Sequence, residues 1–257
     1  MLVALCALVA VPPAALAGSG GSGLSPGGSP IGPAGTTGTS GTSGSGSTPL
    51  PTPENGDGTV STSASGLTLQ TVMSAMLRRG LSFSGTAAPS TAGQTIEIER
   101  SGHETNWTWQ PTVAATVAAD GTFSAVWRTD HIGRFAIRAV VAPSASSAAI
   151  AQSATVTPAL TVTVYRPSRA TQYGPGFYGR RTACGQQLTT GMIGLANRTL
   201  RCGTKVAVYW QGRTLIVPVI DRGPYANGAD WDLTEATAQA LGISGTAEIG
   251  AVSLSQR

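Results

Sequence analysis

The chain has 257 residues, of which 41% are hydrophobic, 5% aromatic and 11% charged, and it contains 34 glycines and 16 prolines. That share of Gly and Pro is too large for one compact domain and too small for a fully disordered chain. The net charge of +4 comes without any basic run longer than a pair of arginines, which excludes a nucleic-acid-binding protein of the usual basic kind.

The first 17 residues, MLVALCALVAVPPAALA, form an apolar run that ends in small residues at Ala15 and Ala17. This pattern predicts a signal peptide over residues 1–17, although the positively charged start of such a signal is missing. The run is too short for a stable membrane span, and Pro12 and Pro13 interrupt it. We therefore expect an exported protein that is secreted, extracellular or associated with the cell wall.

Residues 18–66 consist mainly of Gly, Ser, Thr and Pro, in stretches such as GSGGSG and PLPTPEN. Such a segment has little apolar surface to bury, so nothing offsets the conformational entropy that it would lose on ordering. We therefore predict a disordered linker over residues 18–66.

Between residues 67 and 165, short segments alternate apolar and polar residues, which is typical of half-buried β-strands. The expected strands are Leu81–Gly85, Thr95–Glu99, Thr122–Trp127, Arg134–Val141 and Ala159–Tyr165. They predict an antiparallel β-sandwich over residues 67–165, and this segment resembles the bacterial immunoglobulin-like (Ig-like) modules of surface proteins. Three tryptophans of this region either stack on a sugar or pack in the core, and we favour the core; they are Trp107, Trp109 and Trp127.

Without the signal peptide, two cysteines remain, Cys184 and Cys202. An even number of cysteines in an exported chain predicts one disulfide bond. The alternative is a metal site, but both histidines, His103 and His131, lie in the preceding region. We expect no metal, and the sequence contains no phosphate-binding or dinucleotide-binding motif that would indicate a cofactor.

Four short motifs follow one another in the C-terminal region: YGPGFYG at Tyr173–Gly179, RTLRCGT at Arg198–Thr204, VIDRGPY at Val219–Tyr225 and WDLT at Trp231–Thr234. With them, residues 170–257 resemble the double-psi β-barrel domain of the rare lipoprotein A (RlpA) family. The whole chain is thus expected to be all-β: an Ig-like sandwich, then a six-stranded double-psi barrel with one or two short helices. One helix is expected at Thr234–Leu241, before Gly242.

The resemblance implies a lytic transglycosylase that cuts the MurNAc–GlcNAc bond of peptidoglycan and leaves a 1,6-anhydro sugar. Its partner is the glycan strand, and we expect the protein to act as a monomer. The position that matches the catalytic acid of the family is Asp221, which ends the nearly continuous apolar segment Leu215–Asp221. Such a segment predicts a strand covered on both faces. The alternative role for Asp221 is to cap the turn before Gly223-Pro224.

Two positions depart from the family pattern. Active members carry a Glu and a His where this chain has Gln186 and Asn197, which form hydrogen bonds but do not titrate. We expect both to contact substrate, together with Tyr173, Tyr225 and Asp232.

Asp232 is also a candidate second acid, as in the remotely similar expansins and family 45 endoglucanases. The other interpretation, which we favour, is that Asp232 caps the helix that follows it. Two functions therefore stay open beside transglycosylation. One is a non-catalytic, polysaccharide-binding or expansin-like wall-loosening module, and the other is a hydrolase that uses water between Asp221 and Asp232.

Overall fold

The computed structural model describes residues 49–142, 155–226 and 228–254. Within these ranges the regular secondary structure is mainly β-strand, with one α-helix, Glu235–Leu241 (α1), and two short 3-10 helices, Pro89–Thr91 (η1) and His103–Thr105 (η2). The signal peptide predicted at residues 1–17 lies outside the described residues, as does most of the predicted linker.

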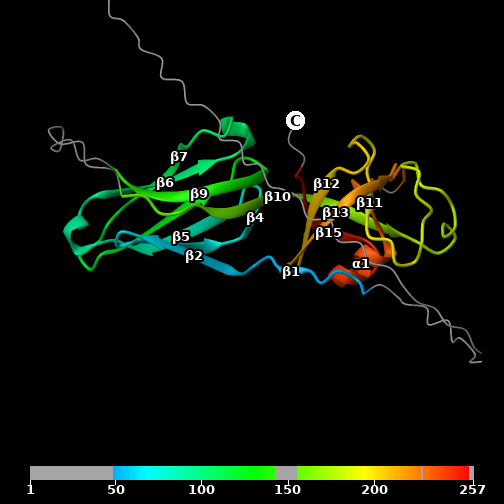
Figure 1. Cartoon of the computed structure of the whole chain (residues 1–257), viewed down its shortest axis with the longest axis horizontal. Coiled ribbons are helices and arrows are strands. Elements are labelled where there is room, and N and C mark those ends of the chain that lie inside the picture. The colour runs from blue at the N-terminus through cyan, green and yellow to red at the C-terminus, as the bar shows by residue number, and fades with distance from the viewer. Residues whose placement is uncertain (1–48, 143–154, 227, 255–257) are drawn as a thin grey trace, which may run out of the picture. The chain divides into compact units, whose positions relative to one another are not determined.

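Two sheets form the two layers of a sandwich (Figure 1). The first sheet is antiparallel, and its strands in spatial order are Thr59–Ala64 (β2), Leu67–Val72 (β3), Gly80–Thr86 (β5) and Thr122–Arg128 (β8). The second sheet contains Ser74–Met76 (β4), Leu160–Tyr173 (β10), Gly133–Val141 (β9), Thr95–Ser101 (β6) and Gln110–Thr116 (β7), also in spatial order.

The sandwich core follows from the alternation in the sequence, because every second residue of a strand points to the same face. Along β8, for example, burial alternates strictly between exposed and buried residues. The inward side chains of both sheets form one apolar cluster, in which Trp127 of β8 meets Phe135 of β9 edge to face at 5.7 Å. Burial of these side chains stabilises the sandwich through the hydrophobic effect.

All five strands expected in this region are present, and the β-sandwich is therefore confirmed. Its Ig-like assignment stays a prediction. The expectation that all three tryptophans pack in the core is confirmed only for Trp127, since Trp107 is 53% exposed and Trp109 is half-buried, with the Arg138 guanidinium 4.1 Å from its ring centroid. The linker boundary also needs correction, because β2 begins at Thr59 rather than after residue 66. Its sequence, TVSTSA, is nearly all polar, and the strand is held by pairing with β3.

Strand β10 belongs to both β-structures of the chain. Its first part pairs with β9 and β4, and its second part, from Arg166 to Tyr173, pairs with the C-terminal strands. The predicted sandwich ended at residue 165 and the predicted barrel began at residue 170, so residues 166–169 were assigned to neither. The chain instead stays extended there as part of β10. Ser168 is buried, and its hydroxyl donates to the carbonyl of Arg166 at 3.2 Å.

Six strands close into the C-terminal barrel, in the order β14-β11-β13-β12-β15-β10, and β10 pairs with β14 to complete the ring. The partners of β10 are Leu195–Ala196 (β11), Lys205–Trp210 (β12), Arg213–Asp221 (β13), Trp231–Thr234 (β14) and Ala247–Ser253 (β15). Two of the pairings, β10–β14 and β11–β13, are parallel, and the other four are antiparallel. The predicted six-stranded barrel is therefore confirmed.

A short strand, Glu54–Asn55 (β1), adds to the outside of β13. The segment after it is also tied to the barrel, because the Gly56 amide donates to the Gly212 carbonyl at 2.7 Å and the Tyr209 hydroxyl donates to Asp57 at 2.7 Å. The described end of the predicted linker is thus ordered on the barrel wall.

Helix α1 begins one residue later than predicted. Its N-cap is Thr234, whose hydroxyl oxygen accepts a hydrogen bond from the Thr237 amide at 3.2 Å, and Gly242 ends the helix in the left-handed conformation with φ +80°. The interpretation of Asp232 as the helix cap is therefore wrong. Asp232 is instead the second residue of β14, which leaves its carboxylate available for another role.

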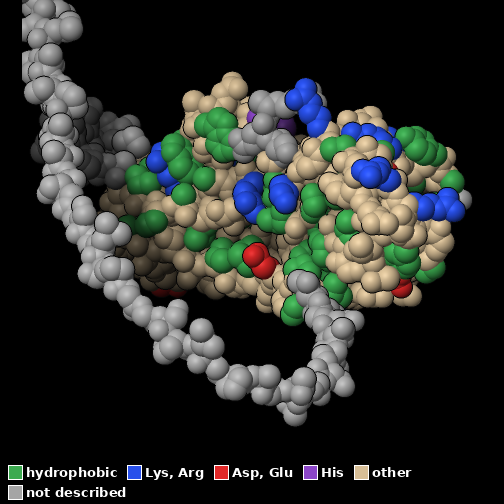
Figure 2. Space-filling view, turned by 45° about the vertical axis from the view of Figure 1, so that its right-hand side comes forward, with side chains coloured by type: hydrophobic (Ala, Val, Ile, Leu, Met, Phe, Trp, Pro, Cys, Tyr) green, Lys and Arg blue, Asp and Glu red, His purple; other side chains and the backbone are tan. Residues whose placement is uncertain are grey.

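The charged side chains are dispersed, as the absence of basic runs led us to expect. On the face shown in Figure 2, Lys and Arg side chains stand in several separate groups, with few acidic side chains between them. This face carries no continuous basic stripe of the kind that tracks a nucleic-acid backbone.

Candidate active site

Strand β13 delivers Asp221 to the end of the barrel. Alternate residues of this strand point into the barrel core, among them Val217 and Val219, which are fully buried. The opposite face is not covered as the apolar run predicted, since Ile216 is 41% exposed. The strand is apolar on both sides, and its outer face is buried only next to Asp221, where Ile220 is 4% exposed.

The Asp221 carboxylate is held by the backbone around it. Its Oδ1 accepts hydrogen bonds from the amides of Ala183 and Arg222, both at 2.8 Å, and its carbonyl oxygen accepts one from the Asn197 amide at 3.2 Å. One of these donors follows Asp221 directly, as the turn-capping interpretation expects. The other comes from a distant loop, so the side chain is fixed by tertiary structure as well.

Asp232 lies beside this position on β14. It stands opposite Thr171 in the parallel β10–β14 register, and the Thr171 hydroxyl donates to Asp232 Oδ1 at 2.8 Å. Burial raises the pKa of the Asp232 carboxyl above its ordinary value, and the nearby charge of Asp221 raises it further, while the Thr171 hydrogen bond opposes both. The two carboxyl groups are thus electrostatically coupled.

A cleft of about 450 Å³ opens over the two carboxylates. It is lined from four parts of the chain: Thr171–Pro175 with Phe177 at the end of β10, Ala196 on β11, Asp221–Ala226 at the end of β13, and Asp232 on β14. Such a cleft, with a few polar groups on apolar walls, is the usual form of a small-ligand site.

Two of the expected tyrosines belong to this cleft. Tyr225 is 79% exposed on its rim, and Phe177 is 51% exposed beside it. The Tyr173 ring lies deeper and meets Phe177 edge to face at 6.1 Å. Burial raises the pKa of the Tyr173 phenol, and the charges of Asp221 and Asp232 raise it further, so that this phenol is protonated at neutral pH.

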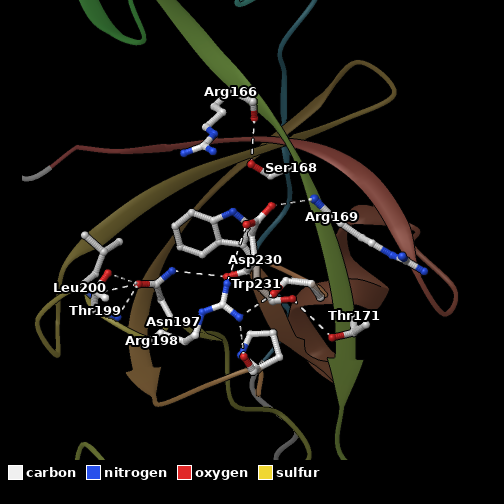
Figure 3. Close-up of polar contacts among 12 residues, drawn as sticks. Arg166, Ser168, Arg169, Thr171, Asn197, Arg198, Thr199, Leu200, Asp230 and Trp231 are labelled. Atoms are coloured by element: carbon white, nitrogen blue, oxygen red, sulfur yellow. Dashed lines mark hydrogen bonds and ion pairs between the residues drawn. The ribbon is translucent and has the colours of Figure 1, made fainter. Parts of the chain in front are cut away.

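Asn197 lies outside the residues that line the cleft. Its side-chain oxygen accepts hydrogen bonds from the amides of Thr199 and Leu200 at 3.1 and 2.9 Å, and its amide group donates to the Asp230 carbonyl at 3.4 Å (Figure 3). The side chain therefore shapes the turn after β11. Its predicted contact with substrate stays a prediction.

The second departure from the family pattern, Gln186, also lies outside the cleft lining. Its side-chain oxygen accepts a hydrogen bond from the Thr182 hydroxyl at 3.1 Å, and its carbonyl accepts one from the Thr182 amide at 2.7 Å. These bonds close the small loop that carries Ala183, one of the two amides bound to Asp221. A substrate contact of Gln186 likewise stays a prediction.

The predicted disulfide is confirmed between Cys184 and Cys202, whose Cα atoms lie 5.6 Å apart. The Cys184 amide donates to the Ile220 carbonyl at 3.3 Å, next to Asp221 in the chain. The disulfide therefore anchors the loop that supplies the Ala183 amide. It contributes to the geometry of the site as well as to stability.

Sequence reasoning missed several residues that complete the site. Arg198 donates to the carbonyls of Pro224 and Ala229 at 2.8 and 3.1 Å, and so holds both ends of the loop that carries Tyr225. Thr171 was missed too, although its position two residues before Tyr173 on an extended strand places both side chains on one face.

Within the described ranges, no group of three or more His, Cys, Asp and Glu side chains is placed to hold a metal ion. The expectation of a site without metal or cofactor stays a prediction. In the same part of the chain, no helix has the length and apolar character needed to cross a membrane.

Comparison with known proteins places the similarity in the barrel. Residues 169–254 match the family described as lytic transglycolase. The chain is 38% identical over 96 residues to a probable endolytic peptidoglycan transglycosylase RlpA of Synechocystis and covers 30% of that protein. It is 42% identical over 76 residues to the corresponding Aquifex aeolicus protein, covering 34% of it. It is 36% identical over 84 residues to the endolytic peptidoglycan transglycosylase RlpA of Campylobacter jejuni, and it covers 30% of that protein.

These matches cover 37%, 29% and 31% of the present chain, and the chain spans about a third of the length of these relatives. Among solved structures, a Streptomyces papain inhibitor aligns with 23% identity and a TM-score of 0.29, over 35% of this chain and 93% of the inhibitor. The resemblance of the C-terminal region to the RlpA family is confirmed, and the family match at residues 169–254 lies in the barrel.

Proposed function

We propose, on the premise that residues 169–254 form a lytic transglycolase domain, that this chain cleaves the glycan strands of peptidoglycan at the MurNAc–GlcNAc bond. The observation that carries the proposal is the cleft in which Asp221, fixed by two amides, lies beside Asp232 among exposed aromatic rings. The names of the relatives support the same activity. Sugar rings stack on aromatic faces of this kind.

In the proposed reaction, Asp221 is the single acid and base. Its protonated carboxyl donates a proton to the oxygen that links MurNAc C1 to GlcNAc C4, and the C1–O bond breaks. The C6 hydroxyl of the same MurNAc then attacks C1 and gives its proton to the Asp221 carboxylate. The products are a 1,6-anhydro-MurNAc end and a GlcNAc with a free C4 hydroxyl, and Asp221 is protonated again.

Asp232 supports this step from beside Asp221. Its burial and its contact with Thr171 keep a second carboxyl group at a fixed place in the cleft. When ionised, this carboxylate stabilises the positive charge that develops on the sugar as the C1–O bond breaks. Water has no role as a nucleophile in this route, which distinguishes it from hydrolysis.

We further propose that the protein is exported and acts at the cell wall. The Cys184–Cys202 disulfide supports this placement, because such bonds persist in oxidising compartments. The substrate is found there as well. Action as a monomer and the predicted signal peptide belong to the same proposal.

The test is mass spectrometry of the soluble products after the mature chain has been incubated with peptidoglycan, both intact and stripped of stem peptides. We expect anhydro-muropeptides from the wild type and none from Asp221→Asn. Asp120→Asn is the matched control, because Asp120 lies in a sandwich turn, where it accepts only the Thr122 bonds among the described residues. Reducing ends in place of anhydro ends would contradict transglycosylation and favour the hydrolase.

A second function, a non-catalytic wall-binding or expansin-like module, is favoured by one observation. Gln186 and Asn197 stand where active members carry titratable residues, and both side chains are engaged in local hydrogen bonds away from the cleft lining. Retention on insoluble peptidoglycan without soluble products of either kind would support this second function.

A further inference from the structure

Tyr173 is held at the floor of the cleft by the strand that both β-structures share. It stands opposite Thr234 in the β10–β14 register, and Thr171, two residues earlier, stands opposite Asp232. Residues two apart on a strand point to the same face, so the Tyr173 ring lies on the same side as the Thr171 hydroxyl that binds Asp232. The edge-to-face contact with Phe177 fixes the ring.

The Tyr173 hydroxyl is buried and has no hydrogen-bond partner within the described part of the chain. The other buried or half-buried tyrosines differ in this respect: the hydroxyls of Tyr165, Tyr178 and Tyr209 contact Thr214, Glu235 and Asp57. A buried donor that binds nothing destabilises a protein, and a phenylalanine would fill the same space without that cost. The hydroxyl is therefore better explained by a partner that arrives with the ligand.

The surroundings make this hydroxyl a donor rather than a base. Burial and the charges of Asp221 and Asp232 all oppose ionisation of the phenol, so it keeps its proton. The cleft around it offers stacking faces at Phe177 and Tyr225. A ligand that brings ring faces and many acceptor oxygens satisfies both features, and a sugar has this chemistry.

We infer that the Tyr173 hydroxyl donates a hydrogen bond to an oxygen of the sugar bound in the cleft, next to the bond that Asp221 breaks. Tyr173 is then a further catalytic residue, because it contacts the substrate itself. The identity of the sugar rests on the proposed function. The role of the hydroxyl as a ligand donor rests on its burial, its lack of a partner and its place in the cleft.

The test is Tyr173→Phe in the full mature chain, with Tyr209→Phe as the matched control. We expect kcat/KM for anhydro-muropeptide formation to fall about 100- to 1,000-fold in Tyr173→Phe, as on removal of one transition-state donor. Its Tm stays the same or rises, since no internal hydrogen bond is lost. Tyr209→Phe loses its bond to Asp57 and shows the reverse: a lower Tm and unchanged kcat/KM.

Affinity for a soluble glycan fragment, measured by calorimetry, separates this inference from the proposed function. If the wild type binds the fragment but forms no anhydro product, transglycosylation fails, and weaker binding by Tyr173→Phe still supports the donor role. Equal affinity and equal kcat/KM in Tyr173→Phe and wild type would overturn it. A wild type that neither binds nor cleaves glycan would overturn both proposals.

Discussion

The sandwich and the barrel both have apolar cores, but they differ in how they treat polar side chains. In the sandwich, the fully buried Thr129 hydroxyl donates to the Met76 carbonyl at 2.7 Å, and Arg138 pairs with Glu99 at 2.7 Å. In the barrel, the Tyr173 hydroxyl and the Trp231 indole nitrogen are buried without partners in the described residues. No sandwich side chain in those ranges shares this feature.

This difference indicates that the sandwich and the barrel have different roles. The sandwich satisfies its buried groups internally and so gains stability, whereas the barrel leaves the Tyr173 hydroxyl without a partner among the described residues at the cleft, where a ligand would complete it. The two parts are nevertheless joined by β10, which lies between β4 and β9 in the sandwich sheet and also forms part of the barrel wall.

The largest expected effect comes from cutting the shared strand. A fragment that starts at Ala170 loses the residues of β10 that pair with Ile249, Gly250 and Ala251 of β15. We expect it to show no cooperative unfolding transition by circular dichroism, because the barrel no longer closes. A fragment from residue 158 keeps all of β10 and serves as the control. Equal Tm values for both fragments would show that the barrel does not depend on this half of the strand.

The next effect separates the core of the sandwich from its surface. Trp127→Ala removes a side chain that is only 5% exposed, and we expect a loss of about 3–5 kcal/mol in the free energy of unfolding. Trp107→Ala, at a side chain 53% exposed, should change it by no more than about 0.5 kcal/mol. Urea titration of both variants measures the contrast, and similar losses would contradict the assignment of Trp127 alone to the core.

The disulfide is expected to matter to the barrel in two ways. The double variant Cys184→Ser/Cys202→Ser opens a loop with a sequence separation of 18, which costs about 3 kcal/mol through the entropy of the unfolded chain. It also loosens the Ala183 amide that holds Asp221, so activity should fall even where the protein is folded. Urea titration and product assays at low temperature check the two effects separately. Unchanged activity in the folded variant would show that Asp221 is held without the loop.

The smallest effect concerns the pH dependence of stability. Burial raises the pKa of Asp232 in the folded state above its unfolded pKa near 3.8. The protonated side chain therefore contributes fully to the free energy of unfolding below the unfolded pKa, and this contribution is lost as pH rises through the folded pKa. Asp232→Asn removes this loss and still accepts the Thr171 hydrogen bond. We expect a higher Tm than wild type at pH 7 and a smaller difference near pH 4, measured by calorimetry. A difference that does not vary with pH would contradict the raised pKa.

Local sequence patterns were enough to predict the all-β fold class. Alternation of apolar and polar residues identified β5, β6, β8 and β9. These strands bury one face, so apolar residues recur at every second position. The same reasoning missed β2, which is almost entirely polar, and β7, which contains Pro111, and it also left out β3 and β4. These strands are held by pairing with their neighbours, which a local pattern does not encode.

The sequence by itself determined the all-β class, the disulfide and the motif that carries Asp221, because each depends on residue types at short spacing. Only the tertiary structure decided that Asp232 faces Thr171 instead of capping α1, and that Tyr173 lies with both carboxylates while Gln186 and Asn197 do not. Closing the barrel brings β10 beside β14, residues about 60 positions apart in the chain. The closure of the barrel therefore decides which side chains line the cleft. No short stretch of sequence encodes this closure.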